Sequence, residues 1–416
     1  MKIFIPLLVL LAGCTGRTPS TADTKEMSNV IDLSNGLKNI KTVRLSDIAD
    51  SVSLLPLETT RQSLFGATKE YIKFTPSYIF YFSSYFDWNG KFCGKIGNRG
   101  NGPLEEPQGV FNVLFTDNHF YSKGSKFIEY DITGKPTRKV MSLYSVSDLY
   151  AGKNPGFLLN GTDFFAEGTD LVIYDYPSTL YFFDRNFEIV SSRIVTKVED
   201  DQIVPGNVGN HVYVTHYKDH ALFYNFMNDT IFDVRNTDLE PRWVVHFDDP
   251  LRLPAQAIAN LNNRDFIAEA AIFARSGRFE DSKFAQLAEN KHMVTAVYET
   301  EAYLFFLMTE IVFMAERRGK QPAMPYVVCY EKNSGQTFRI NGNGFVDDLL
   351  GLDEFFYPSL GIYDEKLIIS IWPHELLEYL KDNKITDRKV NPQLLALSKQ
   401  VKEDDNPIII FVHLKK

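Results

Sequence analysis

Short runs of apolar and aromatic residues alternate with polar turns along most of the chain, and they recur as one repeating unit. Each unit has an apolar run, a turn, and a second run that ends in an aromatic residue followed by an acid. A turn containing Gly or Asn and a further run complete it. Alternating stretches bounded by such turn residues predict β-strands. Five units span residues 78–97, 119–143, 171–194, 212–234 and 326–340.

The acid before the turn marks the period of the repeat. It stands at Asp87, Asp131, Asp184, Asp233 and Glu331, at intervals of 44, 53, 49 and 98 residues. A period of about 40–50 residues with several strands per unit is typical of β-propeller blades. The last interval is twice the one before it, which indicates a long insertion. We expect each acid to bind the amides of its own turn, a structural role.

The repeats predict a closed ring of six blades. A sixth unit runs from residue 355 to 414, while the run at 52–58 has no hairpin partner of its own. Because propellers avoid a free edge by closing the ring, we expect this run to pair with a strand of the last blade. Val52, Leu54 and Leu57 should then be buried. The predicted fold class is an all-β, six-bladed β-propeller closed by an N-terminal strand; seven blades are the alternative.

Two segments interrupt the strands with helical spacing. Apolar residues recur at i, i+4 and i+7 within residues 254–290, and three leucines share one helical face within residues 373–402. Asn391 followed by Pro392 predicts a helix start, with Asn as the cap and Pro in the first turn. We expect two helical insertions that pack on their own blades. The alternative is that both frame a binding surface over the channel.

The N-terminus predicts export and lipidation. A lysine precedes an apolar run of about ten residues, which is too short to span a bilayer as a helix. The Leu-Ala-Gly-Cys sequence that ends at Cys14 resembles a bacterial lipobox. We expect a signal peptide over 1–13, a lipid-anchored flexible tether over 14–40 and the propeller over 41–416. Thr15, where Asp would signal inner-membrane retention, favours the outer membrane; the side that the body faces stays open.

Composition and cysteine spacing argue against nucleic-acid binding and against a zinc site. The 416 residues include 44 Lys+Arg and 53 Asp+Glu, for a net charge of −9. This balance argues against nucleic acid as a partner. Cys93 and Cys329 are interpreted as two buried thiols, with a disulfide between them as the alternative. Neither zinc-type Cys/His spacing nor a hydrolase signature occurs in the sequence, so we expect no metal, no cofactor and no catalytic residue.

The most distinctive segment is the glycine loop at residues 97–109. It matches neither a P-loop nor a dinucleotide-binding pattern. A structural interpretation makes it the crossing from the outer strand of one blade to the inner strand of the next. A functional interpretation makes its polar residues a ligand site. These candidates are Asn98, Arg99, Asn101, Glu105 and Glu106.

Four features together point to a family. They are the run at 48–60, the turn and glycine loop at 89–110, the segment at 228–247, and the lipobox. The set resembles the six-bladed β-propeller lipoproteins of Gram-negative bacteria, which are related to NHL-repeat propellers. The resemblance extends from about Asp47 to Leu414 and implies the fold, but no assigned reaction. The first blade departs from the pattern, because one of its strands is expected to be missing or shortened.

These observations favour an envelope-anchored, non-enzymatic binding module. A rigid ring presents loops and a central channel, and function is usually carried by such loops. The expected partners are the membrane, through the anchor, and a glycan, a peptide or an outer-membrane protein. The alternative is a propeller enzyme, a hydrolase or lyase of sugars or peptides with its active site at the channel mouth.

Overall fold

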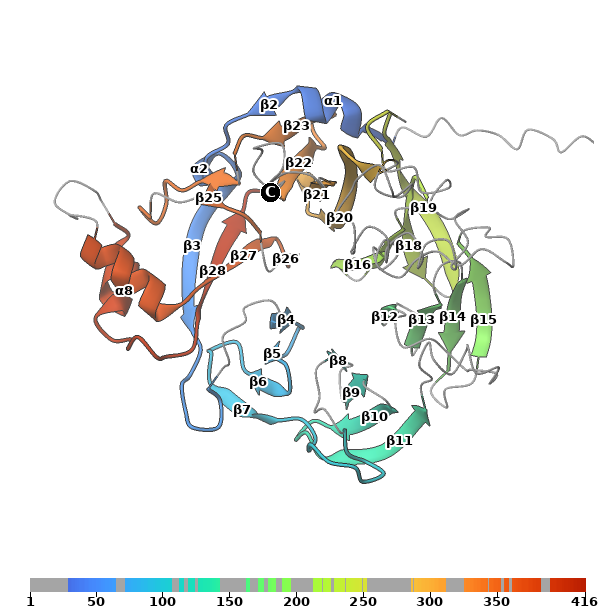
Figure 1. Cartoon of the computed structure of the whole chain (residues 1–416), viewed down its shortest axis with the longest axis vertical. Coiled ribbons are helices and arrows are strands. Elements are labelled where there is room, and N and C mark those ends of the chain that lie inside the picture. The colour runs from blue at the N-terminus through green and yellow to red at the C-terminus, as the bar shows by residue number, and fades with distance from the viewer. Residues whose placement is uncertain are drawn as a thin grey trace, which may run out of the picture.

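The strands of the computed structural model form sheets arranged around a ring (Figure 1). The structure describes residues 29–64, 72–106, 112–115, 119–123, 126–142, 162–164, 171–175, 179–184, 189–195, 212–218, 220–225, 228–235, 237–248, 250–252, 286, 288–311, 325–342, 344–352, 355–358, 361–382 and 390–416. Six sheets within these residues have four or five strands, and one has two. The predicted all-β, propeller-type arrangement is confirmed.

The first three sheets each have four consecutive strands. Sheet 1 contains β4 (Ile72–Phe74), β5 (Ile79–Tyr81), β6 (Ser84–Phe86) and β7 (Phe92–Lys95). Sheet 2 contains β8 (Asn112–Phe115), β9 (His119–Lys123), β10 (Lys126–Asp131) and β11 (Pro136–Ser142). Sheet 3 contains β12 (Thr162–Phe164), β13 (Leu171–Asp175), β14 (Thr179–Phe183) and β15 (Ile189–Ile194).

The other three sheets each include a strand from the N-terminal segment. Sheet 4 contains β16 (Val212–Tyr217), β17 (His220–Asn225), β18 (Thr230–Arg235), β19 (Asp238–His246) and β1 (Val30–Asp32). Sheet 5 contains β20 (Lys291–Glu299), β21 (Tyr303–Ile311), β22 (Tyr326–Glu331), β23 (Gln336–Ile340) and β2 (Ile40–Lys41). Sheet 6 contains β26 (Ile362–Tyr363), β27 (Lys366–Ile371), β28 (Ile408–Leu414) and β3 (Ala49–Pro56). The two-stranded sheet pairs β24 (Phe345–Val346) with β25 (Phe355–Phe356).

Strand β3 joins the N-terminal segment to the last sheet. It pairs antiparallel with β28, from Pro56 opposite Ile408 to Ala49 opposite Leu414. The expectation that an N-terminal strand completes the last sheet is confirmed. Its burial differs from the prediction: Leu57 is buried, whereas Val52 and Leu54 are only half-buried. The reason is that β3 is the outermost strand of its sheet.

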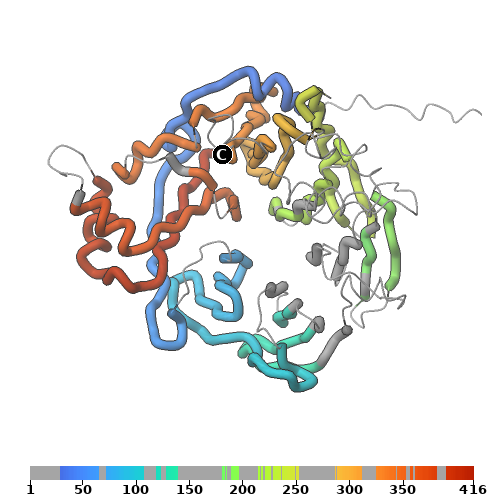
Figure 2. The backbone as a smooth tube through the Cα atoms, in the orientation of Figure 1, coloured from blue at the N-terminus to red at the C-terminus, as the bar shows by residue number. Residues whose placement is uncertain are grey.

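The segment expected to be a tether begins to fold before residue 40. Strand β1 pairs in parallel with β19, and β2 pairs in parallel with β23. Between them lies helix α1 (Leu33–Lys38), and helix α2 (Leu45–Ile48) precedes β3. The segment therefore runs along the outer edges of sheets 4, 5 and 6 (Figure 2). The tether boundary at residue 40 is wrong, because backbone pairing on these edges orders residues 29–40.

Sheet 1 has four strands, so of the two expected departures, a missing or a shortened strand, the structure shows the second. Its middle strands are only three residues long, and Phe82 and Ser83 connect them. Phe82 has a φ of 48°, a left-handed conformation that lets the chain reverse within two residues. The sheet is shortened rather than reduced in strand number.

Acids before the turns bind the turn amides where the pattern is regular. The Asp87 carboxylate accepts hydrogen bonds from the backbone N–H groups of Asn89 and Lys91, each at 2.9 Å. Asp131 accepts equivalent bonds from Thr133 and Lys135. The structural interpretation is confirmed for these two acids.

Asp233 is an exception among these acids. It lies within strand β18 and accepts a hydrogen bond from Arg242 at 3.0 Å instead. The repeat pattern placed it before a turn, and its actual partner is on the neighbouring strand β19.

Each of the two regular turns also contacts the preceding sheet. The Glu58 N–H donates to the Gly90 carbonyl at 2.8 Å, and the Gly97 N–H donates to the Gly134 carbonyl at 3.0 Å. Gly90 has a φ of 79°, and a Cβ there would lie 2.4 Å from the Pro56 carbonyl oxygen. Glycine is required in this turn because no side chain fits the contact.

The second helical insertion is confirmed. Helix α8 (Pro373–Asp382) and helix α9 (Pro392–Ser398) connect β27 to β28. The Asn391 side chain accepts a hydrogen bond from the N–H of Gln393, as expected of an N-cap. Leu376 and Leu394 are fully buried against sheet 6 and its neighbours. Helix α8 lies outside the ring in Figure 1, so this insertion packs on its own blade and does not frame the channel.

Residues 254–285 of the first insertion lie outside the described residues. Among the helices that the structure describes, none is long and apolar enough to cross a membrane.

Candidate functional site

Turns between the first and second strands of four sheets contribute to one region, which we call the inner mouth. It comprises Pro76 in sheet 1, Lys218 in sheet 4, Glu301 in sheet 5, and Asp364 with Glu365 in sheet 6. The Lys218 ammonium lies 2.8 Å from a Glu301 carboxylate oxygen. The Glu301 N–H donates to Glu365 at 3.0 Å. These contacts join the inner turns of sheets 4, 5 and 6.

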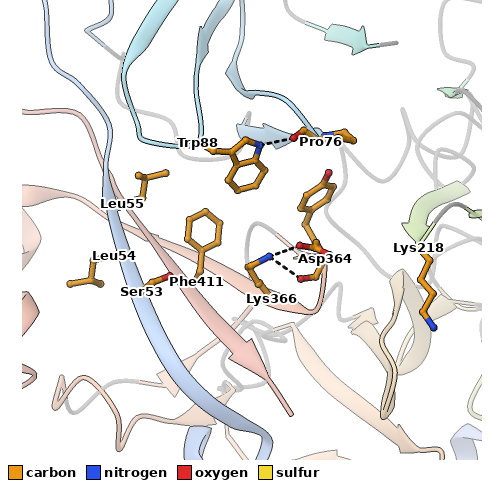
Figure 3. A pocket seen from close by; sticks show the side chains of 10 residues that line it. Ser53, Leu54, Leu55, Pro76, Trp88, Lys218, Asp364, Lys366 and Phe411 are labelled. Carbon is orange, nitrogen blue, oxygen red and sulfur yellow. Dashed lines mark hydrogen bonds and ion pairs between the residues drawn. The ribbon is translucent and has the colours of Figure 1, made fainter. Parts of the chain in front are cut away.

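A cavity of about 770 Å³ opens at the inner mouth, mainly between sheets 6 and 1 (Figure 3). Its volume is in the range of pockets that hold small organic ligands. The residues that line it are Ser53, Leu54, Leu55, Pro76, Trp88, Lys218, Tyr363, Asp364, Lys366 and Phe411.

Aromatic rings form one side of this cavity. Trp88 and Tyr363 are nearly parallel, with ring centroids 5.9 Å apart and planes 20° apart. The ring centroid of Phe411 lies 5.7 Å from that of Trp88 and 6.0 Å from that of Phe74. Trp88 and Tyr363 are half-buried, so part of each ring surface is accessible. The four rings pack together between sheets 6 and 1, and all of them except Phe74 line the cavity.

The Trp88 indole is held in place by the inner turn of its own sheet. Trp88 lies in the turn between β6 and β7, next to Asn89 and Gly90. Its Nε1–H is shared between the carbonyl oxygens of Thr75 at 3.2 Å and Pro76 at 3.0 Å. A buried or half-buried indole usually satisfies its N–H in this way. The ring face therefore has a fixed orientation at the cavity.

The cavity lining also carries paired charges. The Lys366 ammonium contacts the Asp364 carboxylate at 2.5 Å (Figure 3). Lys218 is paired with Glu301. Burial, with a further contribution from Asp364, raises the pKa of Tyr363 to about 12, so its phenol keeps its proton at neutral pH. The lining offers polar groups with little net charge.

The turn that carries Asp364 is conformationally strained. Asp364 and Glu365 have φ values of 47° and 56°, and Tyr363 pairs directly with Lys366 across them. This is a two-residue hairpin of the type that favours Asn-Gly. Two acidic residues in left-handed conformations cost stability that a glycine-containing turn would avoid. Strained residues of this kind concentrate at functional sites, and these two lie at the inner mouth.

A buried ionic cluster supports the inner turn of sheet 5. The Glu299 side chain is fully buried, and both of its oxygens accept hydrogen bonds. Arg242 donates to it at 2.7 and 2.8 Å, Lys332 at 2.7 Å, and the Trp243 indole at 3.1 Å. Burial raises the pKa of Glu299, but the bonds from Arg242 and Lys332 outweigh that effect, and the net pKa is below the ordinary value. Glu299 is therefore ionised and fixes the strand end next to Glu301.

Burial has the opposite net effect on Glu365 at the inner mouth. It raises the pKa of this carboxyl, and the nearby Glu301 carboxylate adds to the increase. The N–H of Glu301 partly compensates by donating to Glu365. Neighbouring acids at the mouth therefore differ in how readily they lose their protons.

The structure places the predicted glycine-loop residues elsewhere. Asn98, Arg99 and Asn101 are exposed, and Glu106 is buried. The Glu105 carboxylate accepts from the N–H of Gly102 at 2.9 Å. The loop follows the outer strand β7, and none of its candidates lines the cavity. Its contacts fit the crossing between blades, the structural interpretation given above.

The two remaining cysteines are both free thiols. Cys329 is buried, as expected, and burial raises the pKa of its thiol. Cys93 is exposed, which corrects the expectation that both are buried. Cys93 lies on β7, the outer strand of sheet 1, so its side chain is not covered by another strand.

Sequence patterns missed the aromatic residues that line the cavity. Trp88 stands beside the Asn-Gly turn and could have been noticed as a rare indole next to a turn. Tyr363 and Phe411 read as ordinary strand residues, and no local pattern sets them apart. In the described part of the chain, no group of three or more His, Cys, Asp or Glu residues is arranged to hold a metal ion.

Comparison with known proteins identifies the family. The profile described as "Domain of unknown function (DUF4934)" matches residues 28–413. The chain belongs to this family. The matched range begins two residues before β1 and so includes the N-terminal strands. No curated protein matches the sequence.

Solved structures agree with the fold. An inferred exported protein of Bacteroides fragilis has a TM-score of 0.61 at 16% identity, covering 93% of this chain and 100% of that one. BamB from Moraxella catarrhalis has a TM-score of 0.27 at 10% identity, covering 70% of this chain and 66% of that one. At these identities the first likeness supports the fold alone, and the second carries no argument.

Proposed function

We propose that this protein is an envelope-anchored binding module in which each of the six larger sheets is one propeller blade. Cys14 carries the lipid anchor, and the outer membrane is the membrane that holds it. Support comes from the lipobox pattern, the ring of sheets, and the likeness to an exported protein. A Cys14→Ala variant should lose labelling by a fatty-acid probe and leave the membrane fraction. Retained labelling and fractionation would contradict the anchor.

The ligand of the inner-mouth cavity is a short, neutral saccharide. The observation that carries this proposal is the combination of accessible aromatic faces with a paired acid and base at one cavity. The C–H faces of a sugar ring pack against the half-buried rings of Trp88 and Tyr363. Its hydroxyl groups exchange hydrogen bonds with Asp364 and Lys366.

Charge favours a neutral ligand over a charged one. Lys366 and Asp364 already neutralise each other, and so do Lys218 and Glu301. A strongly acidic saccharide or peptide would have to compete with these internal pairs, and it would find no unpaired cationic group in the lining. A neutral polyol can bind both members of a pair without separating them.

Calorimetric titration with a panel of neutral mono-, di- and trisaccharides tests this function, with uronic acids and tripeptides as comparison ligands. Trp88→Ala should weaken binding by about tenfold or more, the usual scale for loss of a central aromatic anchor. Trp372→Ala is the matched control, since it removes an indole that does not line the cavity. Absence of binding across the neutral panel, or equal binding by Trp88→Ala, would refute the proposal.

A further inference from the structure

A serine and a histidine on neighbouring strands are joined at the edge of the cavity. The Ser53 Oγ lies 2.8 Å from His413 Nε2, and both side chains are half-buried. Ser53 itself lines the cavity, next to Phe411 (Figure 3). The distance is within hydrogen-bond reach, which is the first requirement for a base that activates a hydroxyl.

Sheet register sets these groups on one face. Ser53 is opposite Phe411 in the β3–β28 pair, and His413 is two residues further along β28. Lys366 of β27 is opposite His413 on its other side. Directly opposed residues, and residues two apart on a strand, share a sheet face. Ser53, His413 and Lys366 therefore come from three adjacent strands and face the cavity side together.

The protonation state of His413 suits a base. Burial and the Lys366 ammonium lower the pKa of His413. The Asp364 carboxylate raises it by a smaller amount, so the net pKa is below the ordinary value. The imidazole is therefore neutral at pH 7 and able to accept a proton. Lys366 stands opposite His413 on the same face, with its ammonium paired to the Asp364 carboxylate at 2.5 Å.

We propose that the cavity hydrolyses short-chain carboxylic esters, with Ser53 as nucleophile and His413 as general base. This activity goes beyond ligand binding and does not depend on the alcohol portion of the ester being a saccharide. The apolar side chains of Phe411, directly opposite Ser53, and of Leu55, two residues along β3, favour a short apolar acyl group beside the nucleophile.

The reaction balances with water as the only co-reactant. Ser53 Oγ bonds to the ester carbonyl carbon while its proton passes to His413 Nε2. The bond from that carbon to the alcohol oxygen breaks, and His413 returns the proton to the departing alcohol. Water then attacks the acyl carbon and gives a proton to His413. The bond to Oγ breaks, Oγ regains a proton, and the carboxylic acid leaves.

A fluorophosphonate probe on the full-length protein tests the nucleophile directly. Intact-mass measurement should show one adduct per chain, and digestion should assign it to the peptide that contains Ser53. The adduct should be absent from Ser53→Ala and His413→Gln. Ser51→Ala is the matched control, because Ser51 is on the same strand and exposed. It should be labelled like the wild type. Absence of an adduct, or an adduct elsewhere, would overturn the proposal.

Hydrolysis of 4-nitrophenyl acetate provides the second measurement. Ser53→Ala and His413→Gln should lower kcat/KM by about a hundredfold or more, the scale of general-base catalysis. The wild-type rate should fall below the pKa of His413, because the protonated imidazole cannot accept the serine proton. Melting curves check that the variants fold. Activity that survives in a folded Ser53→Ala variant would refute the role of Ser53.

Discussion

Replacement of Glu299 should be the most destabilising single change at the edge of the inner mouth. The side chain is 0% exposed and accepts hydrogen bonds from Arg242, Lys332 and Trp243. Glu299→Ala leaves two cationic side chains, 23% and 18% exposed, without their shared carboxylate. Breaking a buried ion pair by removal of one partner costs about 3–5 kcal/mol. Arg242 retains Asp233, so we expect the lower part of that range.

Urea denaturation at neutral pH measures this loss. Glu299→Gln keeps the shape and some hydrogen bonds but removes the charge, so about 1.5–3 kcal/mol should be lost. Glu403→Ala is the control, because its ion pair with Lys381 is largely exposed and should contribute at most about 1 kcal/mol. A loss below about 1 kcal/mol for Glu299→Ala would refute the view that this cluster supports the turn.

The pH dependence gives an independent check. The folded-state pKa of Glu299 is lowered, so its contribution is fully present above the unfolded-state pKa and is lost as the pH falls through the folded-state pKa. The wild type should therefore lose more stability than Glu299→Gln as the pH falls below about 4.5. Parallel curves for the two proteins would show that the carboxylate charge contributes nothing.

Three further outcomes follow from other parts of the fold. Replacement of Asp364 by Asn and of Glu365 by Gly should raise the free energy of unfolding in urea by about 1 kcal/mol, because the turn is no longer strained. The same double variant should bind saccharides more weakly in calorimetry. An unchanged affinity would show that the two acids do not contribute to the cavity. A maleimide should label the exposed Cys93 rapidly and the buried Cys329 only after denaturation, as followed by mass spectrometry. Equal labelling rates in the folded protein would contradict the burial of Cys329. Deletion of residues 1–58 should expose β28 as a free edge and cause aggregation detectable by light scattering, whereas a monomer with an unchanged Tm would show that β3 is not needed to protect that edge.

Local patterns predicted the parts of the fold that depend on local chemistry. The Asn-Gly turn after Asp87, the Asn391 cap and the strand at 52–58 were all visible in the sequence. Each rests on interactions within a few residues, or on the requirement that a ring has no open edge. The parallel pairing of β1 and β2 was not visible, because Val30–Asp32 and Ile40–Lys41 are too short to stand out as strands.

The cavity and its Ser53–His413 pair were not predictable for a related reason. Trp88 meets Tyr363 because sheet 6 lies against sheet 1 in the ring. Ser53 meets His413 because the N-terminal strand β3 pairs with the C-terminal strand β28. Apart from the indole of Trp88 beside its turn, no member of these pairs has a local signature. The glycine loop stood out because its glycines serve a tight crossing, and a strong local signal there reflected backbone geometry rather than ligand chemistry.

Ring closure therefore links stability to the site. The strand that completes the last sheet, β3, also supplies Ser53, Leu54 and Leu55 to the cavity. Its partner β28 supplies Phe411 and His413 from the other end of the chain. The site can exist only when the two ends are paired, so unfolding of the N-terminal segment removes one wall of the cavity at once.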